Sequence, residues 1–205
     1  MEKLYKIKFL SEKGDTPFVS FWNRDKNDVS NNLRFEASDA AQGGNVNLMM
    51  GLPCFEIYTV LNTKKKPFKN EKPYCDIPRA SGFGYLFSMR AVECLKEVLD
   101  KHAYLHPVIH VETGVEYRRV FFTTLIKGVI DIGASDVELW PHGGLQSVNK
   151  LSIKDGITVP DAFKIAECPR GDVFFSQTFV DMVAGCGLTG IEFELASVDN
   201  QLDDK

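Results

Sequence analysis

The most constraining feature of the sequence is a pair of short amphipathic segments, each preceded by an aromatic residue and a serine. Leu86-Phe87-Ser88 precedes the first segment, and Phe174-Phe175-Ser176 precedes the second. A serine at a helix N-cap accepts a hydrogen bond from an otherwise unpaired backbone amide. Both segments are therefore predicted to be helices. Common capping chemistry and internal duplication explain the similarity of the two helix starts equally well.

The first of these helices is predicted to run from Ser88 to about His102. Its apolar residues recur at helical spacing, and its charged residues occupy the opposite side. Glu97 with Lys101, or Glu93 with Lys96, are spaced to form ion pairs along the helix. The predicted core-facing stripe consists of Ala91, Val92, Leu95, Val98 and Leu99.

The second segment belongs to a predicted C-terminal strand–helix–strand unit. A strand delivers Ser176 as the N-cap, and a short helix buries Phe179, Val180 and Val183. Gly187 is placed to end this helix, because glycine adopts the left-handed conformation that commonly follows a helix. The strand that follows, around residues 191–193, is expected to return to the core.

Most of the remaining sequence alternates between short β-type runs and turn residues. Residues 120–126 are rich in β-branched and aromatic side chains, which indicates a strand buried on both faces. Together with the helices, these runs predict an α+β fold with a mixed or antiparallel sheet and a few packed helices. Strands are predicted over residues 3–10, 16–22, 55–61, 108–112, 116–126 and 136–140.

The chain is long enough for one full hydrophobic core. It has 205 residues, of which 44% are hydrophobic. We divide it into a β-rich, loop-rich part over residues 1–83, an α+β part over 84–198 and a polar tail over 199–205, and expect one compact unit. Long loops are predicted over the Gly- and Asn-rich residues 23–51.

Charge and hydropathy argue against two classes of partner. The net charge is −4 and the pI is about 5.6, whereas nucleic-acid binding needs clustered excess Lys and Arg. The basic run Lys64-Lys65-Lys66 is therefore expected to be a solvated connection. No stretch has the ~18 apolar residues of a membrane span, and the N-terminus has no apolar signal core. We predict a cytoplasmic protein that contacts neither nucleic acid nor membrane.

The sequence also lacks a recognisable catalytic constellation. No GxSxG turn presents a serine, and Ser88 and Ser176 are explained as helix caps. The glycine-rich segments 81–84 and 185–190 lack the spacing and the lysine of a phosphate-binding loop. We therefore predict no catalytic residues, no cofactor and no enzyme activity.

Histidine and cysteine spacing does not predict a metal site. His106 and His110 are four residues apart, but the proline and β-branched residues around them favour extended chain. No third ligand accompanies them. The five cysteines are scattered without a CxxC pair and are expected to be free, mostly buried thiols: Cys54, Cys75, Cys94, Cys168 and Cys186.

We select Asp136, Glu138, Trp140 and His142 as the candidate partner-binding residues. Residues 136–140 alternate acidic and apolar side chains ahead of the turn signal Pro141-His142-Gly143-Gly144. Tryptophan is enriched among interface anchors. Other interpretations stay open at this point. Trp140 could instead cover the core, and Asp136 and Glu138 could lie on an ordinary exposed strand or in a catalytic cleft.

The second half of the chain carries a pattern known from one protein family. The pattern is an aromatic residue and a serine at a helix start, a short amphipathic helix, a glycine, and then glycine, an apolar residue, an acidic residue and phenylalanine. The matching residues are Phe174-Phe175-Ser176, Phe179, Val183, Gly187-Leu188-Thr189-Gly190 and Ile191-Glu192-Phe193, with Asp131, Ser135, Val137-Glu138-Leu139-Trp140 and Pro160-Asp161-Ala162-Phe163-Lys164-Ile165 upstream.

On these residues, the chain resembles the bacterial polymorphic-toxin immunity proteins of family eleven, formerly a domain of unknown function. The resemblance covers roughly residues 84–195. It departs from the family at Met89 and Gln177, where an acidic residue often follows the serine, and in the spacer 132–134. It implies a protein that binds and blocks a cognate secreted toxin. The alternatives are an enzyme that hydrolyses a substrate or reverses the toxin's chemistry, with Asp131, Asp136 or a Cys/His pair in its site, and an adaptor of a secretion system.

Overall fold

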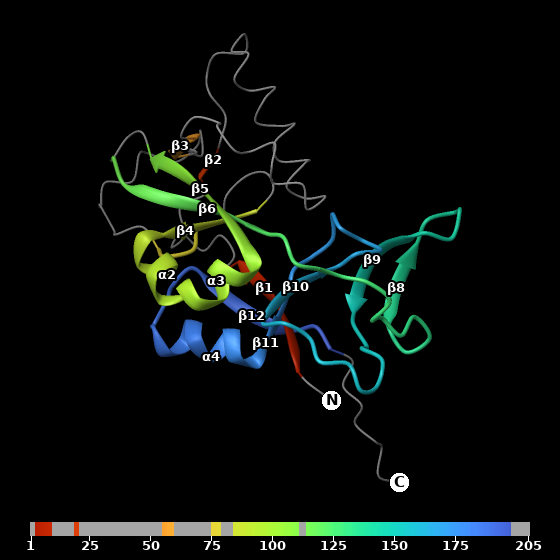
Figure 1. Ribbon diagram of the computed structural model, residues 1–205. Helices are drawn as coiled ribbons and strands as arrows, with labels where there is room; N and C mark the ends of the chain where they lie inside the picture. The colour runs from red at the N-terminus through yellow and green to blue at the C-terminus, as the bar shows by residue number, and fades with distance from the viewer. Residues whose placement is uncertain are drawn as a thin grey trace.

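The computed structural model describes residues 3–9, 19–20, 55–59, 75–78, 84–110 and 114–197. These residues form an α+β fold with antiparallel and mixed sheets, which confirms the predicted fold class (Figure 1). The strands are β1 (Leu4–Phe9), β2 (Val19–Ser20), β3 (Phe55–Thr59), β4 (Tyr85–Ser88), β5 (Ala103–His110), β6 (Glu116–Phe122), β7 (Leu125–Ile126), β8 (Asp136–Leu139), β9 (Leu145–Lys150), β10 (Ala162–Ile165), β11 (Phe174–Ser176) and β12 (Ile191–Leu195), and the helices are α2 (Met89–Cys94), α3 (Lys96–His102) and α4 (Gln177–Gly185).

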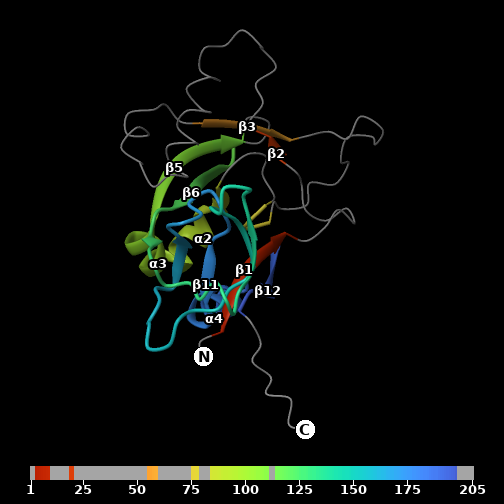
Figure 2. The same ribbon diagram turned by 90° about the vertical axis from the view of Figure 1, so that its right-hand side faces the viewer.

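The first sheet joins the two ends of the described chain. Its strand order is β12-β1-β11-β10-β7, and β1 pairs antiparallel with both β11 and β12. Leu4 lies opposite Ser176, and Ile7 lies opposite Phe193. Figure 2 shows β1 beside β12. The predicted N-terminal part, residues 1–83, thus supplies a strand to the sheet built by the C-terminal strand–helix–strand unit.

Two strands of the first sheet, β10 and β11, are buried on both faces, and their successive side chains point to opposite sides. Phe175 packs in a core with α2, α3, α4 and the second sheet. Its neighbour Phe174 packs in another core, with Leu4, Phe163 and Val148. Every residue of β10 and β11 is buried. These two strands therefore consist mainly of apolar residues without alternation, and Lys164 and Ser176 are their buried polar exceptions.

The second sheet has the order β2-β3-β5-β6-β4, and it corrects two strand boundaries. The strand predicted over 108–112 begins earlier, at Ala103, immediately after α3. The strand predicted over 116–126 is split, because Thr123 donates its amide to the His102 carbonyl and the chain then leaves this sheet. β6 ends at Phe122, and β7 pairs in parallel with β10 of the first sheet.

The helical predictions are confirmed in outline. Ser88 caps α2 by accepting from the Ala91 amide, and Ser176 caps α4 by accepting from the Phe179 amide. The single helix predicted over 88–102 is two short helices that meet at Leu95. Gly187, with φ +59°, follows the end of α4 as predicted. Of the alternative ion pairs, Glu97–Lys101 forms at 3.0 Å, and Lys96 pairs with Asp100 instead of Glu93.

Several predictions fall on residues outside the described ranges. They include the loops over 23–51, the basic run over 64–66, the thiol of Cys54 and the tail over 199–205. The predicted strands over 16–22 and 55–61 are described only at Val19–Ser20 and Phe55–Thr59. Within the described ranges, the helices are too short or too polar to cross a lipid bilayer.

Candidate functional site

The predicted partner-binding residues lie together on the hairpin formed by β8 and β9. In Figure 1 this hairpin extends to the right, away from α2, α3 and α4. The turn is closed by two backbone hydrogen bonds, from the Trp140 amide to the Gly144 carbonyl at 2.7 Å and from the Gly143 amide to the Trp140 carbonyl at 2.8 Å. Gly143 has φ +85°, a conformation that favours glycine, so the predicted turn is local in origin.

The side chains at this turn are directed toward solvent. Trp140 is 48% exposed, so it does not cover the core. Its ring stacks on that of His142, with centroids 6.4 Å apart and planes only 6° from parallel. Asp136 and Glu138 are exposed along β8, while Val137 between them packs into the core beneath. We call Asp136, Glu138, Leu139, Trp140 and His142 the hairpin surface.

Sequence reasoning missed the contribution of Leu139. Strict alternation would turn its side chain inward like that of Val137. A register irregularity between Glu138 and Leu139 breaks the alternation, and Leu139 is 49% exposed. Such irregularities re-aim side chains along a strand and are not visible as a sequence pattern. Leu139 and Trp140 thus form a continuous apolar stretch beside the acidic pair.

The base of the hairpin is firmly attached to the body. The Lys6 ammonium donates to the Val148 carbonyl at 2.6 Å, joining β9 to β1. Asp131, a carboxylate that an enzyme site could have used, accepts from the Gly133 and Ala134 amides at 3.0 and 3.2 Å. Its carboxylate therefore shapes the turn that leads into β8. Asp136 begins β8, immediately after this turn, and is exposed.

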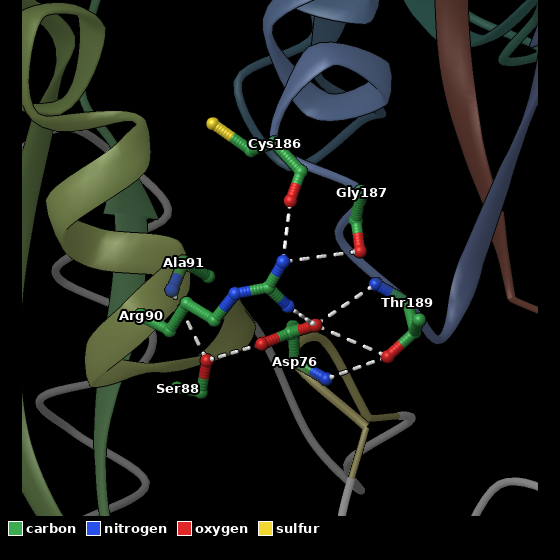
Figure 3. Close-up of polar contacts among 7 residues, drawn as sticks. All are labelled: Asp76, Ser88, Arg90, Ala91, Cys186, Gly187 and Thr189. Carbon is green, nitrogen blue, oxygen red and sulfur yellow. Dashed lines mark hydrogen bonds and ion pairs between the residues drawn. The ribbon is translucent and has the colours of Figure 1, made fainter.

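A second group of polar residues surrounds Asp76, and its role is structural. Asp76 is 8% exposed. Its carboxylate accepts from Ser88 Oγ at 3.0 Å, Arg90 Nη1 at 2.8 Å, and the amide and hydroxyl of Thr189, both at 3.1 Å (Figure 3). Arg90 also donates to the carbonyls of Cys186 and Gly187. This Asp76 cluster joins the start of α2 to the α4–β12 connection.

The same arrangement recurs at the start of α4. Ser176 Oγ donates to Asp161 at 2.7 Å, and the Ser176 amide donates to the Asp161 carbonyl. The Ser88 amide likewise donates to the Asp76 carbonyl. In both copies the hydroxyl caps a helix and donates to a carboxylate, and neither hydroxyl bonds to an imidazole of the described residues. Both serines hold helix starts in place, in agreement with the capping prediction.

The two histidines lie on one face of β5, as their extended spacing predicted. His106 is 1% exposed and His110 is fully buried. His106 lies opposite Arg119 of β6, and its Nδ1 is 3.4 Å from the Tyr104 hydroxyl. Burial lowers the pKa of Arg119. Within the described ranges, no group of three or more His, Cys, Asp or Glu side chains is arranged to hold a metal ion.

The four described cysteines are free thiols. Cys168 is buried, and Cys75, Cys94 and Cys186 are partly buried. Burial, followed by the nearby Asp76 carboxylate, raises the pKa of Cys75 to about 11. A hydrogen bond to Cys186 is the main cause of the raised pKa of Cys94. Raised pKa values disfavour the thiolate, the form that acts as a nucleophile.

The comparisons with known proteins add no relative to this description. The chain matches no protein-family model, and no curated protein matches its sequence.

Proposed function

We propose that this protein binds a protein toxin and neutralises it, using the hairpin surface as the contact. Two observations support the proposal. The residue pattern of the second half resembles the family-eleven immunity proteins, and the hairpin exposes an ordered aromatic pair. The exposed Trp140–His142 stack carries the argument, because tryptophan is enriched among interface anchors and about half of Trp140 faces solvent beside the exposed Leu139.

The hairpin surface has the composition of a binding hot spot. Tryptophan supplies a large contact area and has few rotamers to lose, so its burial by a partner has a low entropic cost. Stacking on His142 already restricts the indole in the free protein. Leu139 extends the apolar area, and it would be covered by the same partner.

The charges beside the stack indicate the kind of partner. Asp136 and Glu138 are exposed, and no described cation forms an ion pair with either of them. Their carboxylates favour a basic surface on the toxin and would speed association. An interface of standard size covers about 800 Å² on each partner. Such an interface involves about 20–30 residues on each side, more than the five residues of the hairpin surface, so flanking residues would also be covered.

Coexpression provides the test. The protein encoded next to this chain should arrest growth when expressed alone and be tolerated when the two are coexpressed. Trp140→Ala should weaken the complex by about 2 kcal/mol, roughly thirtyfold in the dissociation constant. Met89→Ala is a matched control, because Met89 is 43% exposed but lies on α2.

The two variants and the wild type should be equally stable, since both substitutions remove partly exposed side chains. Calorimetric titration would measure binding, and growth after induction would measure neutralisation. If wild-type protein neither forms a complex with its neighbour nor relieves toxicity, the proposed function is wrong. If Trp140→Ala binds as tightly as Met89→Ala, the hairpin is not the contact.

A further inference from the structure

A cavity of about 210 Å³ lies where strands of the two five-stranded sheets meet, and no residue of the hairpin lines it. Among the described residues, four aromatic side chains line it: Phe9 of β1, Tyr85 of β4, and Phe121 and Phe122 of β6. Lys164 of β10 also lines it. The cavity thus combines a ring-lined wall with a buried amine, and the exposed residues Arg170 and Asp172 also line it.

Lys164 is an unusual residue for its position. It is 7% exposed, and its strand neighbours Phe163 and Ile165 are core residues. Its ammonium donates to the Pro169 carbonyl at 3.1 Å. No described carboxylate forms an ion pair with it. An ammonium has three donors, and burying one without a counter-charge is costly. Burial accordingly lowers the pKa of Lys164.

Two other charged residues of the described chain line the cavity, the cation Arg170 and the carboxylate Asp172, and neither forms an ion pair with Lys164. Asp172 lines the cavity, but its carboxylate is paired with the Lys6 ammonium at 2.8 Å. Burial, with a smaller effect from Asp172, raises the pKa of Tyr85 well above its usual range. The Tyr85 hydroxyl therefore stays neutral and keeps a proton that it can donate to an anion.

We propose that this cavity binds a small aromatic carboxylate. The carboxylate accepts hydrogen bonds from Lys164 Nζ and supplies the missing negative charge. The ring packs among the side chains of Phe9, Tyr85, Phe121 and Phe122, where edge-to-face contacts are favourable. The volume is below the roughly 300–1,000 Å³ of pockets for drug-sized ligands, so the ligand has about one ring.

Three probes separate the parts of this proposal on the wild-type full-length chain. Benzoate carries both the ring and the charge, benzamide keeps the ring without the charge, and acetate keeps the charge without the ring. Calorimetric titration or ligand-detected NMR should show that benzoate binds at least about tenfold more tightly than either control. Equal binding of benzoate and benzamide, or no benzoate binding at millimolar concentration, would overturn the proposal.

A Lys164→Met variant adds an independent readout. Methionine fills a similar volume without a charge, so the variant should have a higher melting temperature than the wild type in the absence of ligand. Benzoate should raise the melting temperature of the wild type and leave that of the variant unchanged. An equal benzoate-induced rise in both proteins would refute a role for Lys164. Failure of these tests leaves the toxin-binding proposal intact, because Trp140 and the hairpin are absent from this cavity.

Discussion

Replacing Asp76 by alanine should destabilise the fold far more than replacing Asp161, although both carboxylates hold a capping serine. The Asp76 carboxylate accepts four hydrogen bonds, from Ser88, Arg90 and twice from Thr189. That of Asp161 accepts one from the described residues, donated by Ser176. Hydrogen bonds to a charged acceptor contribute about 1.5–3 kcal/mol each in favourable cases, and leaving buried donors unpaired adds to the loss.

The Arg90 contribution has to be discounted before the bonds are summed. The Arg90 side chain is 56% exposed, so its ion pair with Asp76 is worth about 1 kcal/mol or less. With that allowance, Asp76→Ala should cost about 3–4 kcal/mol and Asp161→Ala about 1–2 kcal/mol. Arg90→Met isolates the exposed pair and should cost about 1 kcal/mol.

Urea unfolding followed by circular dichroism would give the three free energies of unfolding. The m-values should match that of the wild type, which would show that the folded and unfolded states have kept their compactness. The reasoning fails if Asp76→Ala loses no more stability than Asp161→Ala. It also fails if Arg90→Met accounts for most of the loss, because the cluster would then depend on the exposed ion pair.

Two further predictions concern a glycine pair and a thiol. Gly190→Ala should destabilise the protein by more than about 2 kcal/mol, and Gly143→Ala by only about 1 kcal/mol. Both glycines have positive φ, but an added Cβ at Gly190 would lie 2.4 Å from the Ile77 carbonyl oxygen, whereas Gly143 is in open space. Equal losses of stability in thermal unfolding would contradict the steric argument. Cys75 should react slowly with iodoacetamide at pH 8 and faster toward pH 11, because burial raises its pKa from 9.0 to about 11. The raised pKa of Cys75 also makes the stability of the folded protein depend on pH. Its contribution is fully present below pH 9 and is lost as the pH rises through about 11. Peptide mapping of each cysteine would measure the rates, and rapid labelling of Cys75 at pH 8 in folded protein would be inconsistent with its burial.

Local chemistry explains which parts of this fold were predictable. The capping serines, Gly187 and the turn at residues 141–144 depend on neighbouring residues, and their predicted roles agree with the structure. The division of residues 116–126 between two sheets was not predictable, because both halves have the same β-type composition. The break depends on the hydrogen bond from the Thr123 amide to the His102 carbonyl. Periodicity cannot detect such partners.

The candidate site residues also fall into two groups, those that neighbouring residues predict and those that depend on partners distant in sequence. The exposure of Asp136, Glu138 and Trp140 follows from alternation next to a turn, whereas that of Leu139 follows from an irregularity in pairing. The acceptors of Ser88 and Ser176 were missed, since Asp76 and Asp161 precede them by 12 and 15 residues without a repeated spacing. In the sequence, Lys164 appeared only among the residues that match the family pattern. Its burial can be recognised only in the structure, where β10 lies between the two cores.

The position of β1 has a consequence for synthesis of the protein on the ribosome. β1 emerges well before both of its partners, and β12 follows it by nearly the whole described chain. Until residues 191–195 leave the exit tunnel, one edge of Leu4–Phe9 has no strand to pair with and can capture a strand from another chain. Native pairing must then join residues that are far apart in sequence, which slows folding. Production of the protein should therefore benefit from chaperones that shield this strand as it emerges.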